Sequence, residues 1–240
     1  MWSGPRNIST AMMRAFENRQ DTSVSDEPFY AAYLAESGLL HPMRAEILTS
    51  QPQDPERVIS EITGPVPNGR EVWYQKHMTH HMLPSFDRSW IDRVYNAFLV
   101  RSPESVLASY VEKRADVTLE EIGLPQQVAL FDRVADRLGQ APPVLDGADV
   151  LANPRAALTV LCARCGIAFD PAMLAWPAGA RSSDGIWAPA WYDKVIQSTG
   201  FGPPRAEAFF EDLRDDLKPI AAAARPFYER LARYRMKPLP

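Results

Sequence analysis

The sequence predicts a three-layer α/β fold, in which helices flank a mainly parallel sheet, followed by an α-helical C-terminal extension. Over the first 170 residues, short β-like segments alternate with helical ones, a pattern typical of βαβ units. The 240-residue chain is 46% hydrophobic, which is enough to bury one sizeable core. We therefore predict a single domain over residues 1–240, with a core over about 1–170 and a loop-rich and helical extension over about 171–240.

Short β-like segments are predicted as strands over residues 22–26, 71–76 and 96–100, with a weaker strand over 143–146. Another strand is expected before Gly4, yet only three residues precede it. We therefore expect either a very short first strand or a sequence that begins late. Apolar residues at helical spacing predict helices over residues 9–18, 104–114, 126–138 and 153–165.

Local signals support these boundaries. The Ser-Pro pair at positions 102 and 103 and the Asn-Pro pair at 153 and 154 each supply an N-cap and a first-turn proline. Gly166 can end the helix of residues 153–165 in a left-handed conformation. Residues 175–204 are rich in Trp, Pro, Gly and Ser, which predicts loops. Beyond them we expect helices broken at Pro219 and Pro226.

Charge and composition limit the classes of binding partner that we expect. The net charge is −4 and the chain has no Lys/Arg run, so no nucleic-acid partner is expected. We find neither a signal peptide nor an apolar run of about 18 residues, so we expect a cytoplasmic protein without membrane contact. Cys162 and Cys165 have no second Cys/His pair at zinc-finger spacing, so we interpret them as helix packing and predict no metal.

An anion-binding loop is predicted over residues 4–10, which read GPRNIST and lead into the first helix. The first N–H groups of a helix lack partners and its dipole is positive there, so an anion is stabilised. Arg6 adds a fork of donors, and Ser9 and Thr10 add hydroxyls. The segment lacks the Gly-Lys pair of an ATP-binding GxxxxGK[ST] loop. The alternative is an ordinary helix capped by Asn7 or Ser9.

A second anion signal follows the segment of residues 96–100. Arg101 lies at the C-terminal end of that strand, where ligands bind in open α/β sheets. Ser109 lies about two helical turns further on. The guanidinium and the hydroxyl can hold one phosphate between them; the alternative is an ion-paired arginine and a solvent-facing serine.

Candidate bases cluster after Lys76, where three of the four histidines lie within five residues. Neutral histidine accepts a proton near pH 7, and Lys76 can supply a cation beside it. If this loop is helical, His77 and His81 share a face, so we prefer His77, then His81, and His80 last. Packing is the alternative for these histidines, and a metal site is not favoured because acidic partners cannot be located.

Glu27 is a second candidate base, since a carboxylate can also take a proton. It follows the strand of residues 22–26 and precedes Pro28. The alternative is charge complementarity at a helix start that has Pro28 as its first residue.

The two anion signals together resemble the cofactor motifs of the cytosolic and carbohydrate sulfotransferases. The family's 5′-phosphosulfate loop reads Pro-Lys/Arg-Ser-Gly-Thr-Thr, and residues 5–10 read PRNIST, so Asn7 and Ile8 replace the Ser-Gly pair. The family's 3′-phosphate motif, Arg-x-Pro-x-x-Val with a later Ser, is matched at Arg101, Pro103, Val106 and Ser109. Residues 143–169 also resemble the family's fifth strand and the helix after it.

The resemblance implies a fold like that of the P-loop nucleoside triphosphate hydrolases and 3′-phosphoadenosine-5′-phosphosulfate (PAPS) as donor, without a metal. It implies that residues 6–10 bind the 5′-phosphate and that Arg101 and Ser109 bind the 3′-phosphate. The family's Lys-Thr-His resembles Lys76-His77 with the histidine one residue early, and its Glu-Pro resembles the pair at Glu27.

The aromatic segment of residues 181–192 resembles a late family loop, Arg-Lys-Gly-x-x-Gly-x-Trp, that touches the 3′-phosphate. Gly185 and Trp187 match, and Arg181, one residue out of step, is a further candidate phosphate ligand. The alternative is a packed surface lid.

These features together predict a sulfotransferase that moves a sulfuryl group from PAPS to a hydroxyl or amine of a small-molecule acceptor. A P-loop small-molecule or nucleotide kinase and a non-catalytic nucleotide-binding protein remain as alternatives.

Overall fold

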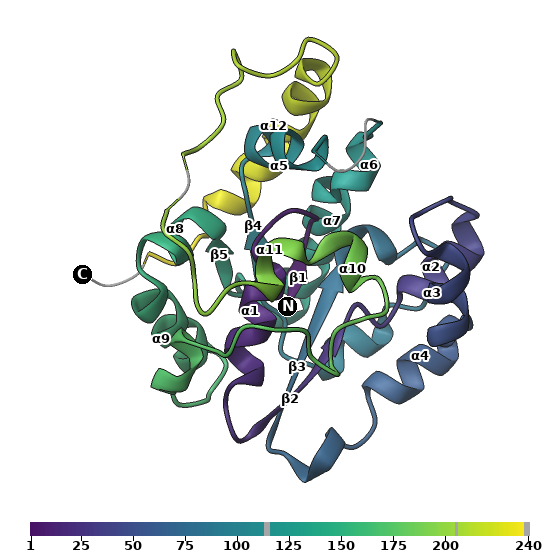
Figure 1. The fold of residues 1–240 in the computed structure, drawn as a ribbon, viewed down its shortest axis with the longest axis vertical. Coiled ribbons are helices and arrows are strands. Elements are labelled where there is room, and N and C mark those ends of the chain that lie inside the picture. The colour runs from purple at the N-terminus through teal and green to yellow at the C-terminus, as the bar shows by residue number, and fades with distance from the viewer. Residues whose placement is uncertain (113–115, 205, 238–240) are drawn as a thin grey trace.

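The computed structural model describes residues 1–112, 116–204 and 206–237. Its sheet contains the strands β1 (Trp2–Ser3), β2 (Thr22–Asp26), β3 (Val72–Met78), β4 (Phe98–Val100) and β5 (Val144–Asp146), all parallel and in the order β2-β3-β1-β4-β5. The predicted parallel sheet is confirmed, and the expected first strand is two residues long. Figure 1 shows helices on both sides of this sheet.

Four helices correspond to the predicted ones, namely α1 (Ser9–Glu17), α5 (Pro103–Tyr110), α7 (Leu124–Leu138) and α9 (Pro154–Arg164). The helix predicted over residues 104–114 ends at Tyr110, and its residues 113 and 114 lie outside the described part of the chain. The structure adds α2 (Tyr30–Ser37), α3 (Arg44–Ser50), α4 (Pro55–Ile62), α6 (Leu119–Ile122), α8 (Gly147–Ala152), α10 (Ala188–Trp191) and α11 (Asp193–Ile196).

The predicted helix boundaries are formed in two different ways. Asn153 caps α9 by accepting a hydrogen bond from the Ala156 N–H at 3.1 Å, and Gly166 follows with φ 73°. Ser102 occupies the N-cap position of α5, but its side chain makes no cap hydrogen bond. Its hydroxyl is buried without a hydrogen-bond partner among the described residues, so the predicted side-chain cap is corrected to a positional one.

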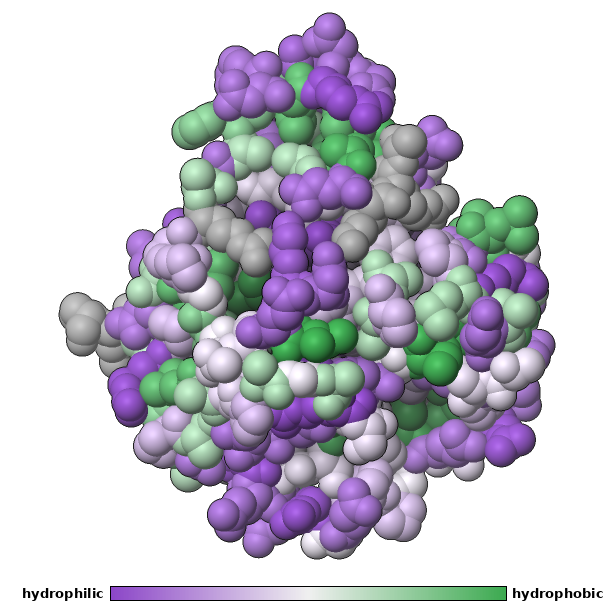
Figure 2. Space-filling model, viewed as in Figure 1, coloured by the Kyte–Doolittle hydropathy of each residue, from purple (hydrophilic) through white to green (hydrophobic). Residues whose placement is uncertain are grey.

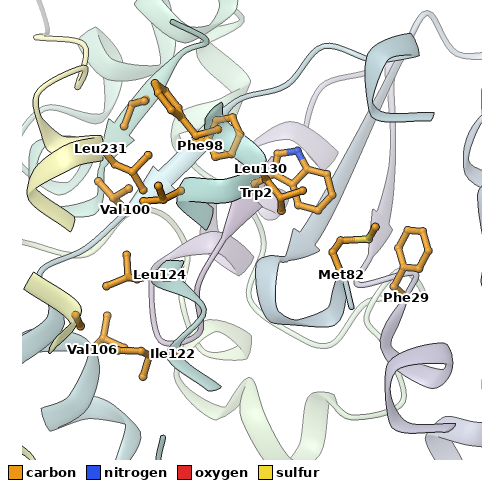
Figure 3. Close-up of a cluster of buried hydrophobic side chains, with 14 of the residues drawn as sticks. Trp2, Phe29, Met82, Phe98, Val100, Val106, Ile122, Leu124, Leu130 and Leu231 are labelled. Atoms are coloured by element: carbon orange, nitrogen blue, oxygen red, sulfur yellow. The ribbon is translucent and has the colours of Figure 1, made fainter. Parts of the chain in front are cut away.

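Alternating side chains divide the core between the two faces of the sheet. Phe98, Val100 and Val144 pack with Trp2 and with residues of α5 and α7 on one face. Figure 3 shows Trp2, Phe98 and Val100 in this cluster. Leu99 and Leu145 point the other way, to residues of α1 and α9. Because successive side chains of a strand face opposite sides, these short strands hold both helical layers, and the three-layer architecture is confirmed.

The C-terminal part contains one long helix where two breaks were predicted. Helix α12 (Lys218–Ala232) has Pro219 in its first turn and Pro226 in its interior. It packs on α5 and α7, with Ala221, Ala224 and Leu231 buried. This packing outweighs the loss of one backbone hydrogen bond at Pro226, which costs about 3 kcal/mol. The breaks predicted at Pro219 and Pro226 are therefore wrong, because the helix continues through both residues.

The surface shown in Figure 2 is largely hydrophilic, with hydrophobic residues in small separate areas. In the part of the chain that the structure describes, no helix has both the length and the apolar character needed to cross a membrane.

Candidate active site

A cavity of about 360 Å³ lies beyond the carboxyl ends of β1, β2 and β3. This is the edge at which open α/β sheets bind ligands. Its walls come from the predicted anion loop, from Glu27 and Lys76, from the 3₁₀ turn η2 (Thr79–His81), from Ser109 and from residues 191–202. The structure thus brings most of the predicted site residues to one cavity.

The anion loop joins β1 to α1 and is held in an unusual backbone conformation. Arg6 has φ 56°, and its carbonyl oxygen accepts a hydrogen bond from Arg101 Nη1 at 2.5 Å. Asn7 Nδ2 donates to the Leu99 carbonyl at 2.8 Å, which ties the loop to β4. A left-handed non-glycine residue costs free energy and typically persists only where its surroundings fix it. Here two neighbouring segments fix it.

The start of α1 faces the cavity without a side-chain cap. Its N-cap residue is Ile8, so neither Asn7 nor Ser9 fills the capping role considered as the alternative. Ser9 and Thr10 line the cavity. Because the first N–H groups of a helix have no partners within it, this end of α1 suits a phosphate.

Arg6 links the two predicted phosphate sites. Its Nε donates to Ser109 Oγ at 3.0 Å, so the residues expected at the 5′- and 3′-phosphates are in direct contact. Ser109 lines the cavity, whereas Arg101 does not and bonds the Arg6 carbonyl from behind. Arg101 thus fixes the loop in this structure, and its direct contact with a phosphate stays a prediction.

A buried lysine lies at the inner end of the cavity. Lys76 is 1% exposed, and its Nζ donates to Asp26 Oδ1 at 2.8 Å and to Glu27 Oε1 at 2.6 Å. Asp26 is the last residue of β2 and Glu27 follows it directly. Strand β2 lies beside β3 in parallel register, with Asp26 opposite Lys76. Two carboxylates therefore share one buried cation.

Glu27 has the electrostatics of a proton acceptor. Burial raises the pKa of its carboxyl above the ordinary value of 4.5, Lys76 opposes this, and the Asp26 charge adds to it. Glu27 also has φ 44°, a second left-handed non-glycine residue at the end of a strand. A carboxyl whose pKa is moved toward neutrality is suited to general base catalysis.

Two aromatic residues in the late segment complete this cluster, and neither was predicted as part of it from the sequence. The Tyr192 hydroxyl is 2.5 Å from Lys76 Nζ and 2.7 Å from Asp26 Oδ2, and Trp187 Nε1 donates to it at 3.0 Å. The density of aromatics after Gly185 was the available signal. That density predicts a packed surface lid, because the sequence does not show that this segment returns to β2 and β3.

Histidines form the adjacent wall. His81 Nδ1 lies 4.0 Å from Glu27 Oε2, and the ring stacks on Tyr30 with centroids 4.5 Å apart. His80 also lines the cavity, and burial lowers its pKa to about 3. Burial likewise lowers the pKa of His81 well below its ordinary value, so both rings are neutral at pH 7. His41, the histidine outside the predicted cluster, lines the same wall.

His77, the preferred base from sequence, lies on the other side of the sheet. It belongs to β3, and its ring packs 4.7 Å from Trp2 and 5.3 Å from Trp90, while Nε2 lies 3.1 Å from Gln75 Oε1. Lys76 faces the cavity, and the next residue of a strand faces away from it. The expectation that His77 and His81 share a helical face is corrected by this strand geometry.

Arg181 is not brought to the anion loop either. Its Nη1 pairs with Glu17 Oε2 at 2.9 Å. Glu17 is the last residue of α1, whereas the anion loop lies at the opposite end, before the first residue of this helix. In this region Arg14 Nη2 also pairs with Asp184 at 2.6 Å. These contacts attach the late segment to α1, and the phosphate role of Arg181 stays a prediction. Among the described residues, no three or more His, Cys, Asp or Glu side chains are arranged to hold a metal ion.

Comparison with known proteins adds independent information. Two curated proteins of Arabidopsis thaliana, named branched-chain-amino-acid aminotransferase-like proteins 1 and 2, are 34% and 33% identical to this chain over 204 residues. The match covers 85% of this chain and 36% of each relative, so the chain spans about a third of their length.

Solved structures show the same fold. The sulfotransferase domain of the Synechococcus PCC 7002 olefin synthase aligns with a TM-score of 0.52 and 19% identity, covering 92% of both chains. The sulfotransferase domain of the curacin biosynthetic pathway aligns with a TM-score of 0.50 and 16% identity, covering 92% of this chain and 95% of the other. A family model described as a sulfotransferase domain matches residues 1–235, and this chain therefore belongs to the sulfotransferase domain family.

Proposed function

We propose that this protein transfers a sulfuryl group from PAPS to a hydroxyl or amine of a small-molecule acceptor, with Glu27 as the general base. One observation carries the proposal: a single cavity joins the anion loop and Ser109 to the Glu27–Lys76 pair. Membership of the sulfotransferase domain family supports it.

The donor side of the cavity suits a nucleotide with phosphates at both ends. PAPS supplies a sulfuryl group attached to a 5′-phosphate, which becomes the leaving group. The uncapped start of α1 and Arg6 would stabilise the charge that develops there, which is electrostatic catalysis. Ser109 would bind the 3′-phosphate, and Arg101 would keep the Arg6 backbone in place.

The acceptor side provides a base and a hydrogen-bonding neighbour. The acceptor oxygen or nitrogen would attack sulfur as the bond to the 5′-phosphate breaks, and its proton would pass to Glu27. Lys76 holds Glu27 Oε1, which leaves Oε2 toward His81. The neutral His81 can hydrogen-bond the same acceptor group, so it would orient the acceptor while Glu27 takes the proton.

Calorimetry with the desulfated product, 3′-phosphoadenosine 5′-phosphate, tests donor recognition. Wild type is expected to bind it without Mg²⁺, and Arg6→Ala and Arg101→Ala are expected to bind it more weakly. A wild type that ignores this nucleotide, or that binds ATP in a Mg²⁺-dependent manner instead, contradicts the proposal. A panel of small hydroxyl and amine acceptors, read by release of the desulfated product, then tests transfer, with Glu27→Gln as the inactive control.

A further inference from the structure

The Tyr192 hydroxyl occupies the centre of the buried cluster. It lies 2.7 Å from Asp26 Oδ2, 2.9 Å from Asp26 Oδ1 and 3.3 Å from Glu27 Oε1. Lys76 Nζ approaches it to 2.5 Å, and the same ammonium lies 4.7 Å from the centre of the Tyr192 ring. Tyr192 is therefore the only described side chain outside β2 and β3 that hydrogen-bonds all three charged groups of the cluster.

The hydrogen-bonding capacity of this hydroxyl is used up. A phenol has one proton and can accept two hydrogen bonds. Lys76 and Trp187 Nε1 both donate to the oxygen, which fills its acceptor positions. The single proton is shared unequally between the two carboxylates: its stronger hydrogen bond goes to Asp26 Oδ2 at 2.7 Å and a weaker one to Glu27 Oε1 at 3.3 Å. Tyr192 thus has no atom left with which to exchange a proton with a substrate.

The two carboxylates are consequently unequal. Asp26 receives hydrogen bonds from Lys76, from Tyr192 and from the backbone N–H of Gly185 at 3.1 Å. Glu27 receives a short bond from Lys76 and a long one from Tyr192, both at Oε1. Asp26 is satisfied within the protein, and Glu27 Oε2 remains available to the cavity.

We propose that Tyr192 is a positioning residue that commits Asp26 to Lys76 and so leaves Glu27 as the carboxylate that serves the cavity. This inference rests on the proposed function only for the identity of the reaction. Trp187 acts through Tyr192, because its indole N–H donates a hydrogen bond to the phenol oxygen and holds it in place. The late aromatic segment thereby contributes to the chemistry without being required to touch the acceptor.

Titration of Glu27 in the free protein tests this role. The carboxyl can be followed by ¹³C NMR after labelling of glutamate side chains, and the signal that disappears in Glu27→Gln assigns it. In Tyr192→Phe, Asp26 loses a donor and draws Lys76 away from Glu27, and Glu27 loses its own bond to Tyr192. Both effects favour the protonated form, so the Glu27 midpoint is expected at higher pH. The titratable groups that face Glu27 are Asp26 on β2, Tyr30 on α2, Lys76 on β3, His81 on η2 and Tyr192.

Tyr74→Phe is the matched control. Tyr74 lies two residues before Lys76 on β3, and its buried hydroxyl has no hydrogen-bond partner among the described residues. The Glu27 midpoint is expected to stay at the wild-type pH in this variant. Trp187→Phe is expected to raise the midpoint by less than Tyr192→Phe does. It carries the test alone if Tyr192→Phe does not fold by circular dichroism.

An unchanged or lowered Glu27 midpoint in folded Tyr192→Phe overturns the proposal, and so does an equal shift in Tyr74→Phe. With an acceptor from the panel, the acid limb of the kcat/KM profile is expected to move to higher pH along with the Glu27 midpoint. A merely structural role would lower stability without moving that limb. Because the titration needs neither donor nor acceptor, failure to bind the desulfated nucleotide would refute the proposed function and leave this inference standing.

Discussion

Replacement of Lys76 by methionine tests whether the buried cluster stabilises the fold as a charge-balanced unit. Lys76→Met keeps a long side chain but leaves Asp26 and Glu27 adjacent, with side chains 2% and 10% exposed. Removal of one partner from a buried ion pair costs about 3–5 kcal/mol, because a buried charge is left uncompensated. Total stabilities are about 5–15 kcal/mol, so the variant is expected to lose a large fraction of its free energy of unfolding.

The loss of free energy of unfolding in Lys76→Met should increase as pH rises. The folded state raises the pKa of Glu27 above 4.5, chiefly by burial, and loss of Lys76 removes an influence that lowers it. A carboxyl with a raised folded-state pKa binds its proton more tightly when folded, so stability falls as pH rises above the unfolded pKa. The difference between wild type and Lys76→Met should therefore be smallest near pH 4.5 and grow toward pH 8.

Urea denaturation followed by tryptophan fluorescence at several pH values measures this difference. Lys194→Met is the control, because Lys194 and Glu112 form an ion pair with side chains 58% and 55% exposed. Exposed pairs contribute about 0–1 kcal/mol. A cost below about 1 kcal/mol for Lys76→Met at pH 8, or a cost that does not change with pH, would refute the view that two buried carboxylates depend on this lysine.

Three further changes probe the loop, the base and a tight turn. Arg6→Ala is expected to weaken binding of the desulfated nucleotide about 10–100-fold by calorimetry, since hydrogen bonds to charged groups contribute about 1.5–3 kcal/mol; unchanged affinity would exclude Arg6 from the donor site. Glu27→Gln should lower kcat about 10²–10⁴-fold while nucleotide affinity is retained, and full turnover would require another base. Gly123→Ala should cost more stability in thermal melts than Gly139→Ala. Both glycines have positive φ, at 74° and 64°, but only at Gly123 would the new Cβ meet another group, Thr79 Oγ1 at 2.5 Å; equal losses would show that the contact relaxes.

Parts of the fold that depend on local pattern could be predicted from sequence. Strand β2 occupies the predicted residues 22–26, because it is bounded by polar turns and carries β-branched residues. The helices α2, α3 and α4 were not predicted: α2 and α3 are short and pack mainly with each other and with residues near Trp187. Their stability comes from tertiary contacts, which local propensity does not record.

The base shows why a shift of one residue matters. A histidine one position earlier than in the related motif looks like a small displacement in sequence. Within a strand, however, side chains alternate with a period of two, so this displacement turns the ring of His77 to the opposite face of the sheet. Glu27 follows β2 as predicted, but only the register of β2 with β3 shows that Lys76 meets it. Tyr192 could not be assigned to the cluster from the sequence, because it lies 116 residues after Lys76 and only the fold brings the two together.

The separation of these residues along the chain also bears on how the protein folds during synthesis. Asp26, Glu27 and Lys76 emerge from the ribosome long before Tyr192, which follows four-fifths of the 240 residues. Until that segment arrives, the charged side chains lack the phenol that completes their hydrogen bonds, and exclusion of water from them is unfavourable. A nascent chain that ends before Tyr192 should therefore keep this corner of the sheet hydrated and open to hydrogen exchange, and the site should close only after Tyr192 has left the ribosome.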